Sequence, residues 1–182
     1  MMSLKGHEMN FASLAQLDCS MVELPYKGNR IVMQVILPKE KTGVFELETK
    51  LGEVDLQTQF SENKKNVKVD LSLPRFKLSH SLALNDSLQQ MGMADMFKAD
   101  KADLSGITGG PNDLYVSSVL QKVFVEVNEE GSEAAAAATA IGVGRGCTPP
   151  RMFHVDHPFL FIIRDKPTGM ILFQGRVVDP SA

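Results

Sequence analysis

Extended apolar runs dominate both ends of the chain and predict two hairpins. Residues 19–24 and 30–37 flank a Gly-Asn turn, an arrangement typical of a β-hairpin. The second run has few polar residues, which predicts a central strand covered on both faces. Near the other end, residues 159–163 and 170–173 are joined by a turn that contains Pro-Thr-Gly. We expect this second hairpin to be buried as well.

The middle of the chain mixes strands with short helices. Apolar residues between 45 and 60 recur near the helical period and predict one or two short surface helices. Residues 67–73 alternate apolar and polar side chains, as expected for a strand with one wet face. A second extended segment follows, then a short helix over 86–91 with Asn85 as its N-cap, and a long strand over 114–127. The predicted fold class is therefore α+β, mainly β.

Composition and charge exclude several classes of protein. The 182 residues are 43% hydrophobic and 23% charged, which indicates a globular chain and disfavours disorder and coiled coils. A net charge of −3 predicts no nucleic-acid partner. No apolar stretch reaches the roughly 18 residues of a membrane span, so no membrane partner is expected. The two cysteines, Cys19 and Cys147, are too few for a disulfide scaffold or a zinc site, and their pairing stays open.

The segment after the predicted long strand is rich in small residues. Alanine has the best helix propensity, so the run considered alone indicates a surface helix. Three glycines, an Arg-Gly bond and a return through Pro-Pro into extended chain indicate instead a loop between two strands. The run comprises Glu129, Glu130, Gly131, Ser132, Glu133, Ala134, Ala135, Ala136, Ala137 and Ala138, and it leads to Arg145 and Gly146.

These residues resemble the C-terminal half of the serpins, the serine protease inhibitor family. Residues 129–137 are similar to the glycine, small hydroxyl, glutamate and alanine hinge of inhibitory serpins. Residues 153–163 fit the family's C-terminal signature, and 74–76, 102–107 and 175–180 also match in order. The resemblance therefore covers essentially the whole chain.

The resemblance implies a serpin fold. We expect residues 1–182 to form the C-terminal part of a single serpin domain: hairpins of the buried sheets, two central-sheet strands and a few short helices. Residues 129–150 would be the exposed reactive loop. Serpins present this loop as bait, and after a protease attacks one bond the loop inserts into the central sheet.

Spacing within the loop selects the reactive bond. The family places the scissile residue fifteenth when the hinge glycine is first, and counting from Gly131 reaches Arg145. The reactive bond is then Arg145–Gly146, with Arg151 as a second candidate. Every second residue from Ser132 onward is small, as insertion under a packed sheet requires. A long cationic side chain at the reactive bond implies a trypsin-like serine protease as partner, held in a covalent acyl complex at Arg145.

Supporting residues follow from the same resemblance. Arg75 and Glu129 match positions that form a salt bridge at the top of the sheet in many serpins. Gln121 stands where the family often places a histidine in a sheet-opening cluster, and a glutamine can also donate and accept hydrogen bonds. His154 and His157 would point to opposite faces of an extended segment, so we expect no metal site. No cofactor is expected, and the lack of a catalytic-triad motif predicts an inhibitor and not an enzyme.

Two functions remain. The first is an inhibitor of trypsin-like serine proteases, favoured because no bulky or charged residue spoils the inserting positions. The alternative is a non-inhibitory serpin-like binding or carrier protein, or an inactive truncated fragment. Because the resemblance is to the second half of serpins, we expect the activity to belong to a longer, secreted, extracellular parent chain whose leader these residues lack. Polyanion binding, glycosylation at Asn85 and the physiological protease stay open.

Overall fold

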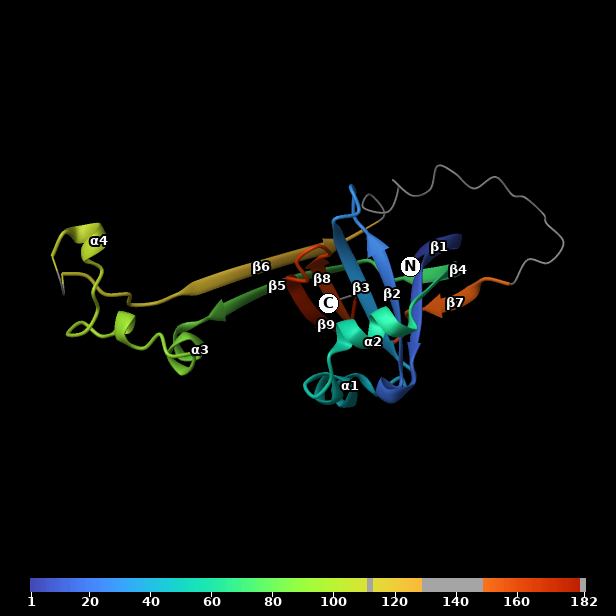
Figure 1. Ribbon diagram of the computed structural model, residues 1–182, viewed down its shortest axis with the longest axis horizontal. Helices are drawn as coiled ribbons and strands as arrows, with labels where there is room; N and C mark the ends of the chain where they lie inside the picture. Colours follow the sequence, from blue (N-terminus) through green and yellow to red (C-terminus); the bar gives the residue numbers. More distant parts are fainter. Residues whose placement is uncertain (111–112, 129–148, 181–182) are drawn as a thin grey trace. The chain divides into compact units, whose positions relative to one another are not determined.

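The computed structural model describes residues 1–110, 113–128 and 149–180, which fall into two compact units. The first unit comprises Met1–Phe76 and Val127–Ala182, and the second comprises Lys77–Glu126. Figure 1 shows the strands and helices along the chain. The strands are β1 (Met2–Leu14), β2 (Cys19–Pro25), β3 (Ile31–Pro38), β4 (Lys65–Leu73), β5 (Phe76–Ala83), β6 (Leu120–Val127), β7 (Arg151–His154), β8 (Phe159–Asp165) and β9 (Ile171–Val177). The α-helices are α1 (Val44–Leu51), α2 (Leu56–Asn63), α3 (Asn85–Gln90) and α4 (Ser105–Thr108), with 3-10 turns over Ala15–Leu17 and Asp95–Phe97.

The first unit is built on a seven-stranded sheet with the order β7-β4-β1-β2-β3-β8-β9. The β4–β7 pair is parallel and the other neighbours are antiparallel. β2 and β3 form the predicted first hairpin, with Cys19 opposite Pro38 at its open end. All residues of β3 after Ile31 are buried, which confirms the prediction of a central strand covered on both faces.

Two short helices cover one face of this sheet (Figure 1). They confirm the helices predicted between residues 45 and 60. Asp55 caps α2, because its carboxylate accepts hydrogen bonds from the amides of Gln57 and Thr58 at 3.0 and 3.3 Å. The core under the helices combines helical and sheet residues: Ala12, Leu14, Leu17, Cys19, Met21, Ile36, Val44, Leu47, Leu56, Phe60, Leu160 and Ile162. Each large apolar side chain buried there contributes about 1.5–3 kcal/mol.

The opposite face of the sheet holds a second, aromatic core. The ring centroid of Phe76 lies 5.6 Å from those of both Phe159 and Phe161. Phe161 also packs over the β9 backbone at Gly175, where an added Cβ would lie 2.8 Å from its ring. A glycine is therefore required at this crossing. The two cores together fix the strands that carry the C-terminal signature residues.

The N-terminal strand β1 was not predicted. It runs from Met2 to Leu14 and is an interior strand of the sheet, between β4 and β2. Its register on β4 shifts between Leu4 and His7, and Gly6 adopts a φ of 64° there. This bulge breaks the alternation of side chains along the strand, so a regular period of two is not visible in the sequence.

The second hairpin forms, but the prediction that it is buried is wrong for its second strand. β8 is almost entirely buried, with Arg164 alone partly exposed. In contrast, the first four residues of β9 are exposed, including Ile171 at 49%, Leu172 at 43% and Phe173 at 41%. β9 is the last strand of the sheet, so in the described part of the chain it has one neighbouring strand only.

The second unit contains a two-stranded sheet of β5 and β6, which run in opposite directions (Figure 1). The strand predicted over 114–127 is shorter than expected and starts at Leu120. The side chain of Asn85 explains the difference. Its Oδ1 accepts a hydrogen bond from the Val119 backbone amide at 2.8 Å, and its Nδ2 donates to the Ser117 carbonyl at 3.0 Å. Since these backbone groups are engaged by a side chain, they are unavailable for strand pairing.

The role predicted for Asn85 as a helix cap is also wrong. The N-cap of α3 is Leu84, and Asn85 is the first residue of the helix. The side chain of Asn85 hydrogen-bonds the backbone of the segment before β6, and it does not cap a backbone amide of α3. The helix ends at Gln90, and Gly92 follows with a φ of 97°, a conformation that favours glycine.

Candidate functional site

The structure describes the elements at both ends of the segment predicted to be the reactive loop. β6 ends at Val127, and β7 begins at Arg151. Residues 129–148 lie outside the described residues. The predictions that fall there are the reactive bond Arg145–Gly146 and the hinge residues Glu129, Glu130, Gly131, Ser132, Glu133, Ala134, Ala135, Ala136, Ala137 and Ala138. They stay predictions, and the described chain resumes at residue 149.

The chain after this segment is held by β7. Its four residues pair in parallel with β4, from Val69 opposite Arg151 to Ser72 opposite His154. The Phe153 side chain is only 2% exposed, and its ring meets that of Phe11 edge-on, with centroids 6.3 Å apart. Beyond β7, the Val155 amide donates to the Ser72 carbonyl at 2.9 Å. Backbone pairing and one buried aromatic ring therefore anchor this end.

His157 ties the connection from β7 to β8 to the end of β3. Its Nε2 atom lies 2.8 Å from the Pro38 carbonyl oxygen, and Nδ1 lies 2.7 Å from Oδ1 of Asp156. The hydrogen bond from His157, with the nearby Lys41 ammonium at 3.7 Å, lowers the pKa of Asp156 below its ordinary value. These contacts give His157 a structural role: both ring nitrogens are engaged, one by the Pro38 carbonyl and the other by the Asp156 carboxylate.

The two supporting positions predicted outside the loop are both on the surface. Arg75 is exposed between β4 and β5, next to the buried Pro74. Its predicted partner Glu129 lies outside the described residues, so the salt bridge stays a prediction. Gln121 lies on β6 with its side chain exposed. The sheet-opening cluster predicted around Gln121 also stays a prediction.

A buried polar network was missed in the sequence. The Gln34 side chain, fully buried on β3, exchanges hydrogen bonds with Gln57 of α2 at 2.9 and 3.2 Å. Gln34 also donates to Glu23 of β2 at 3.3 Å, and Asn10 of β1 donates to the same carboxylate at 3.1 Å. Arg164 of β8 donates to Gln57 as well. A glutamine inside the apolar run 31–37 was the available signal, because buried polar groups need partners.

The described residues offer no site for a metal ion. No group of three or more His, Cys, Asp or Glu side chains in this part of the chain could hold one. His154 is exposed on β7, with its side chain on the side opposite to the buried Phe153. No helix of the described structure is long and apolar enough to cross a membrane.

Comparisons with known proteins identify relatives over nearly the whole chain. Residues 1–180 match the family model described as Serpin (serine protease inhibitor). Serpin B3 of Homo sapiens is 48% identical over 173 residues, which are 94% of this chain and 44% of that protein. Leukocyte elastase inhibitor of Homo sapiens is 42% identical over 175 residues, 93% of this chain and 46% of that protein. A solved serpin from the trematode Schistosoma haematobium is 30% identical, with a TM-score of 0.80, and the match covers 98% of this chain and 46% of that one.

The relatives overturn the expected location. The expectation of a secreted, extracellular protein is wrong, because relatives such as Serpin B3 and leukocyte elastase inhibitor are clade B serpins, which are intracellular rather than secreted. The resemblance to serpins as a whole did not distinguish this branch, so it implied the location of the secreted members.

The match is specific in sequence and in structure. The chain spans about half the length of the curated relatives it matches. Those relatives are protease inhibitors. The solved neighbours are serpins, and the mixed, mainly β fold agrees with a partial serpin fold, as predicted. A family model matched over residues 1–180 and two relatives above 40% identity lead to one conclusion: this chain belongs to the serpin family.

Proposed function

We propose that this chain supplies the reactive loop, and the strands that anchor it, to a serpin that inhibits trypsin-like serine proteases. The observation that carries the proposal is the position of Arg145, fifteenth from the hinge residue Gly131. We assign residues 1–182 to the C-terminal part of a single serpin domain and 129–150 to its reactive loop. The strands β6 and β7 flank this segment in the order that the assignment requires.

The proposed reaction begins as an ordinary proteolysis. The serine oxygen of the protease attacks the carbonyl carbon of Arg145, an ester forms, and the bond to Gly146 breaks with the proton going to its amine. Residues 131–145 then insert as a new strand beside β6. Every second residue from Ser132 to Gly144 is small, so these side chains enter a packed sheet with little overpacking. The ester stays unhydrolysed because insertion deforms the protease.

Insertion needs a second neighbour for the new strand. The two-stranded sheet of β5 and β6 provides one side only. Since the chain spans about half the length of its relatives, we assign the inhibitory step to a longer parent chain. In that chain, an ion pair between Arg75 and Glu129 would hold the top of the sheet where insertion starts, and Gln121 would hydrogen-bond across the strand gap.

The residue at the reactive bond sets the target class. Leukocyte elastase inhibitor of Homo sapiens, one of the relatives, is named for elastase. Arg145 instead presents a permanently charged guanidinium, which is best bound by a specificity pocket with a carboxylate at its base. We therefore propose a trypsin-like enzyme as the partner. An exposed arginine without the hinge spacing would not support this assignment.

The test is the formation of a covalent complex with trypsin. The full-length parent should give a complex that survives boiling in detergent on a gel, and Arg145→Ala should abolish it. Arg151→Ala is the matched control, because it removes the other nearby arginine and should leave the complex intact. Cleavage without any complex would reject inhibition in favour of a non-inhibitory, serpin-like binding protein.

A further inference from the structure

Positively charged side chains gather where β4 begins and β7 starts. We call this set the basic edge; all of its members are exposed, and they are Lys64, Lys65, Lys68 and Arg151. None of them forms an ion pair with another residue of the described structure. Three acidic residues lie along the same stretch: Glu62 two residues before Lys64, Glu8 opposite Lys68 in the β1–β4 register, and Asp70, which accepts a hydrogen bond from the Gly6 amide at 2.7 Å. The basic edge is a local excess of positive charge on a chain with a net charge of −3.

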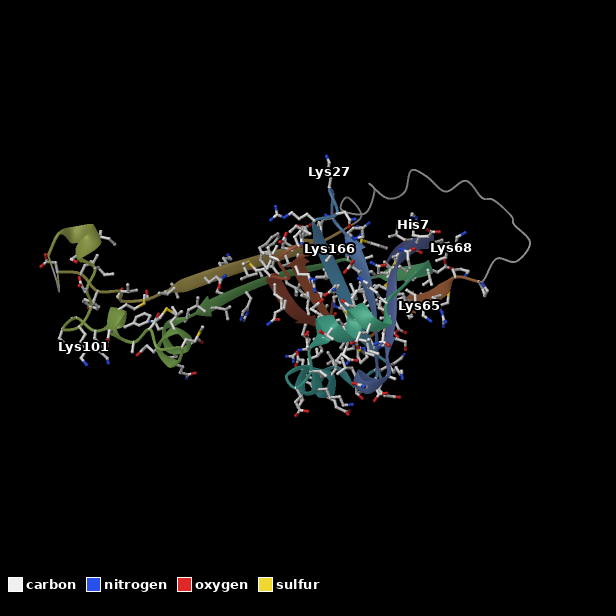
Figure 2. All side chains as sticks on the ribbon, in the orientation of Figure 1. His7, Lys27, Lys65, Lys68, Lys101 and Lys166 are labelled. Carbon is white, nitrogen blue, oxygen red and sulfur yellow. The ribbon has the colours of Figure 1, made fainter. Side chains whose placement is uncertain are left out.

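The register of the sheet leaves the basic edge open. β7 pairs with residues 69–72 of β4, so among the described residues no strand covers that side of 65–68. Lys65 and Lys68 point to alternate faces, yet both are exposed because this part of β4 has an open side. Figure 2 shows both lysines on the β4–β7 side of the sheet. A partner approaching the start of β7 therefore meets them together.

The basic edge lies within reach of the proposed reactive bond. Arg145 precedes Arg151 by six residues, which span at most about 22 Å. Lys65 precedes Val69, the residue paired with Arg151, by four residues, or about 13 Å along the strand. A folded domain of about 200 residues has a radius of gyration of about 16 Å. A protease bound at Arg145–Gly146 is large enough to extend over the basic edge.

We propose that the basic edge binds an acidic surface of the target protease, beside the cleft that receives the residues after the reactive bond. This inference rests on the proposed function, because it takes Arg145–Gly146 as the bond attacked. Complementary charges near a docking site mainly raise the association rate. A protein surface fits better than a sulfated polymer, because a protein can place basic groups opposite Glu8 and Asp70 and acidic groups opposite the cations, whereas a uniformly negative chain cannot.

The test measures association with trypsin in which the catalytic serine is replaced by alanine, so that binding occurs without cleavage. An anionic and a cationic trypsin are immobilised, and the 182-residue chain is passed over them at low and high salt. The Lys65→Gln/Lys68→Gln variant should bind anionic trypsin roughly threefold more slowly or worse at low salt, with little effect at high salt or on cationic trypsin. Lys39→Gln/Lys41→Gln is the matched control, since it removes two exposed charges elsewhere on the same unit and should change little.

The outcomes separate this inference from the proposed function. If Arg145→Ala abolishes binding while Lys65→Gln/Lys68→Gln binds anionic trypsin at the unaltered rate, the inference is overturned and the proposed function stands. If Arg145→Ala binds both trypsins normally, both are overturned. Retention on a heparin column is measured in parallel. If Lys65→Gln/Lys68→Gln reduces this retention but leaves the association rate with trypsin unchanged, the basic edge binds polyanions and the inference is wrong. Urea midpoints of both double variants equal to that of the unaltered chain establish that folding is unaffected.

Discussion

Replacing Phe153 with alanine should loosen the strand that anchors the downstream end of the proposed loop. The side chain is 2% exposed and packs edge-on against Phe11. Truncation of a buried phenylalanine costs about 3–5 kcal/mol, of which the aromatic pair accounts for about 0.5–1.5 kcal/mol. A domain is stable by about 5–15 kcal/mol, so this change removes a large share of the free energy of unfolding. At a typical slope, the urea midpoint should fall by about 2 M.

The neighbouring residue supplies the control. Met152 lies on the same strand, is 69% exposed and should tolerate alanine within about 0.5 kcal/mol. Urea unfolding followed by circular dichroism measures both variants. Brief digestion with trypsin gives a second readout, because the Arg151–Met152 bond is protected while β7 is paired with β4 and becomes accessible in Phe153→Ala. Equal stability losses for the two variants, with no new cut after Arg151, would refute the anchoring role of Phe153.

Three further predictions concern other parts of the chain. Asn85→Ala should lower the free energy of unfolding by about 1–3 kcal/mol and speed hydrogen exchange of the Val119 amide. Asn85→Asp keeps the acceptor oxygen, so the Val119 amide should exchange more slowly in it than in the alanine variant. The Arg30 guanidinium, 2.6 Å away, holds the pKa of Asp165 below its usual range. The resulting stabilisation is present above the unfolded pKa of Asp165 and is lost as the pH falls through the folded one, so Arg30→Gln should move the acid-unfolding midpoint, measured by circular dichroism, to higher pH. Burial raises the pKa of the Cys19 thiol to about 12, so iodoacetamide at pH 8 should leave Cys19 unmodified in the folded chain and alkylate it in urea, as measured by mass spectrometry.

The elements with regular patterns were predictable from the sequence. The hairpin of β2 and β3 shows continuous apolar runs around a Gly-Asn turn, and α1 and α2 carry helical spacing between residues 45 and 60. β4 alternates along most of its length. In each case one local signal determines the structure, because the period, the turn residues and the burial agree.

The missed features depend on contacts between distant residues. In β1, the bulge at Gly6 interrupts the alternation of apolar and polar side chains. β6 starts later than predicted because Asn85, more than 30 positions earlier, hydrogen-bonds the backbone of Ser117 and Val119. The exposure of β9 follows from its place at the sheet edge, which strand hydrophobicity does not reveal. The family could be recognised because its motifs are local, whereas the location depended on the branch of the family.

The most direct test of the account is the position of the first cut that trypsin makes in the 182-residue chain. At a limiting amount of enzyme and short times, intact-mass spectrometry should find fragments 1–145 and 146–182 first, from cleavage of Arg145–Gly146. The Arg145→Ala variant should lose this cut and retain its other sites. A first cut at Arg151–Met152 or within residues 1–128, with Arg145–Gly146 intact, would contradict the assignment of the reactive bond.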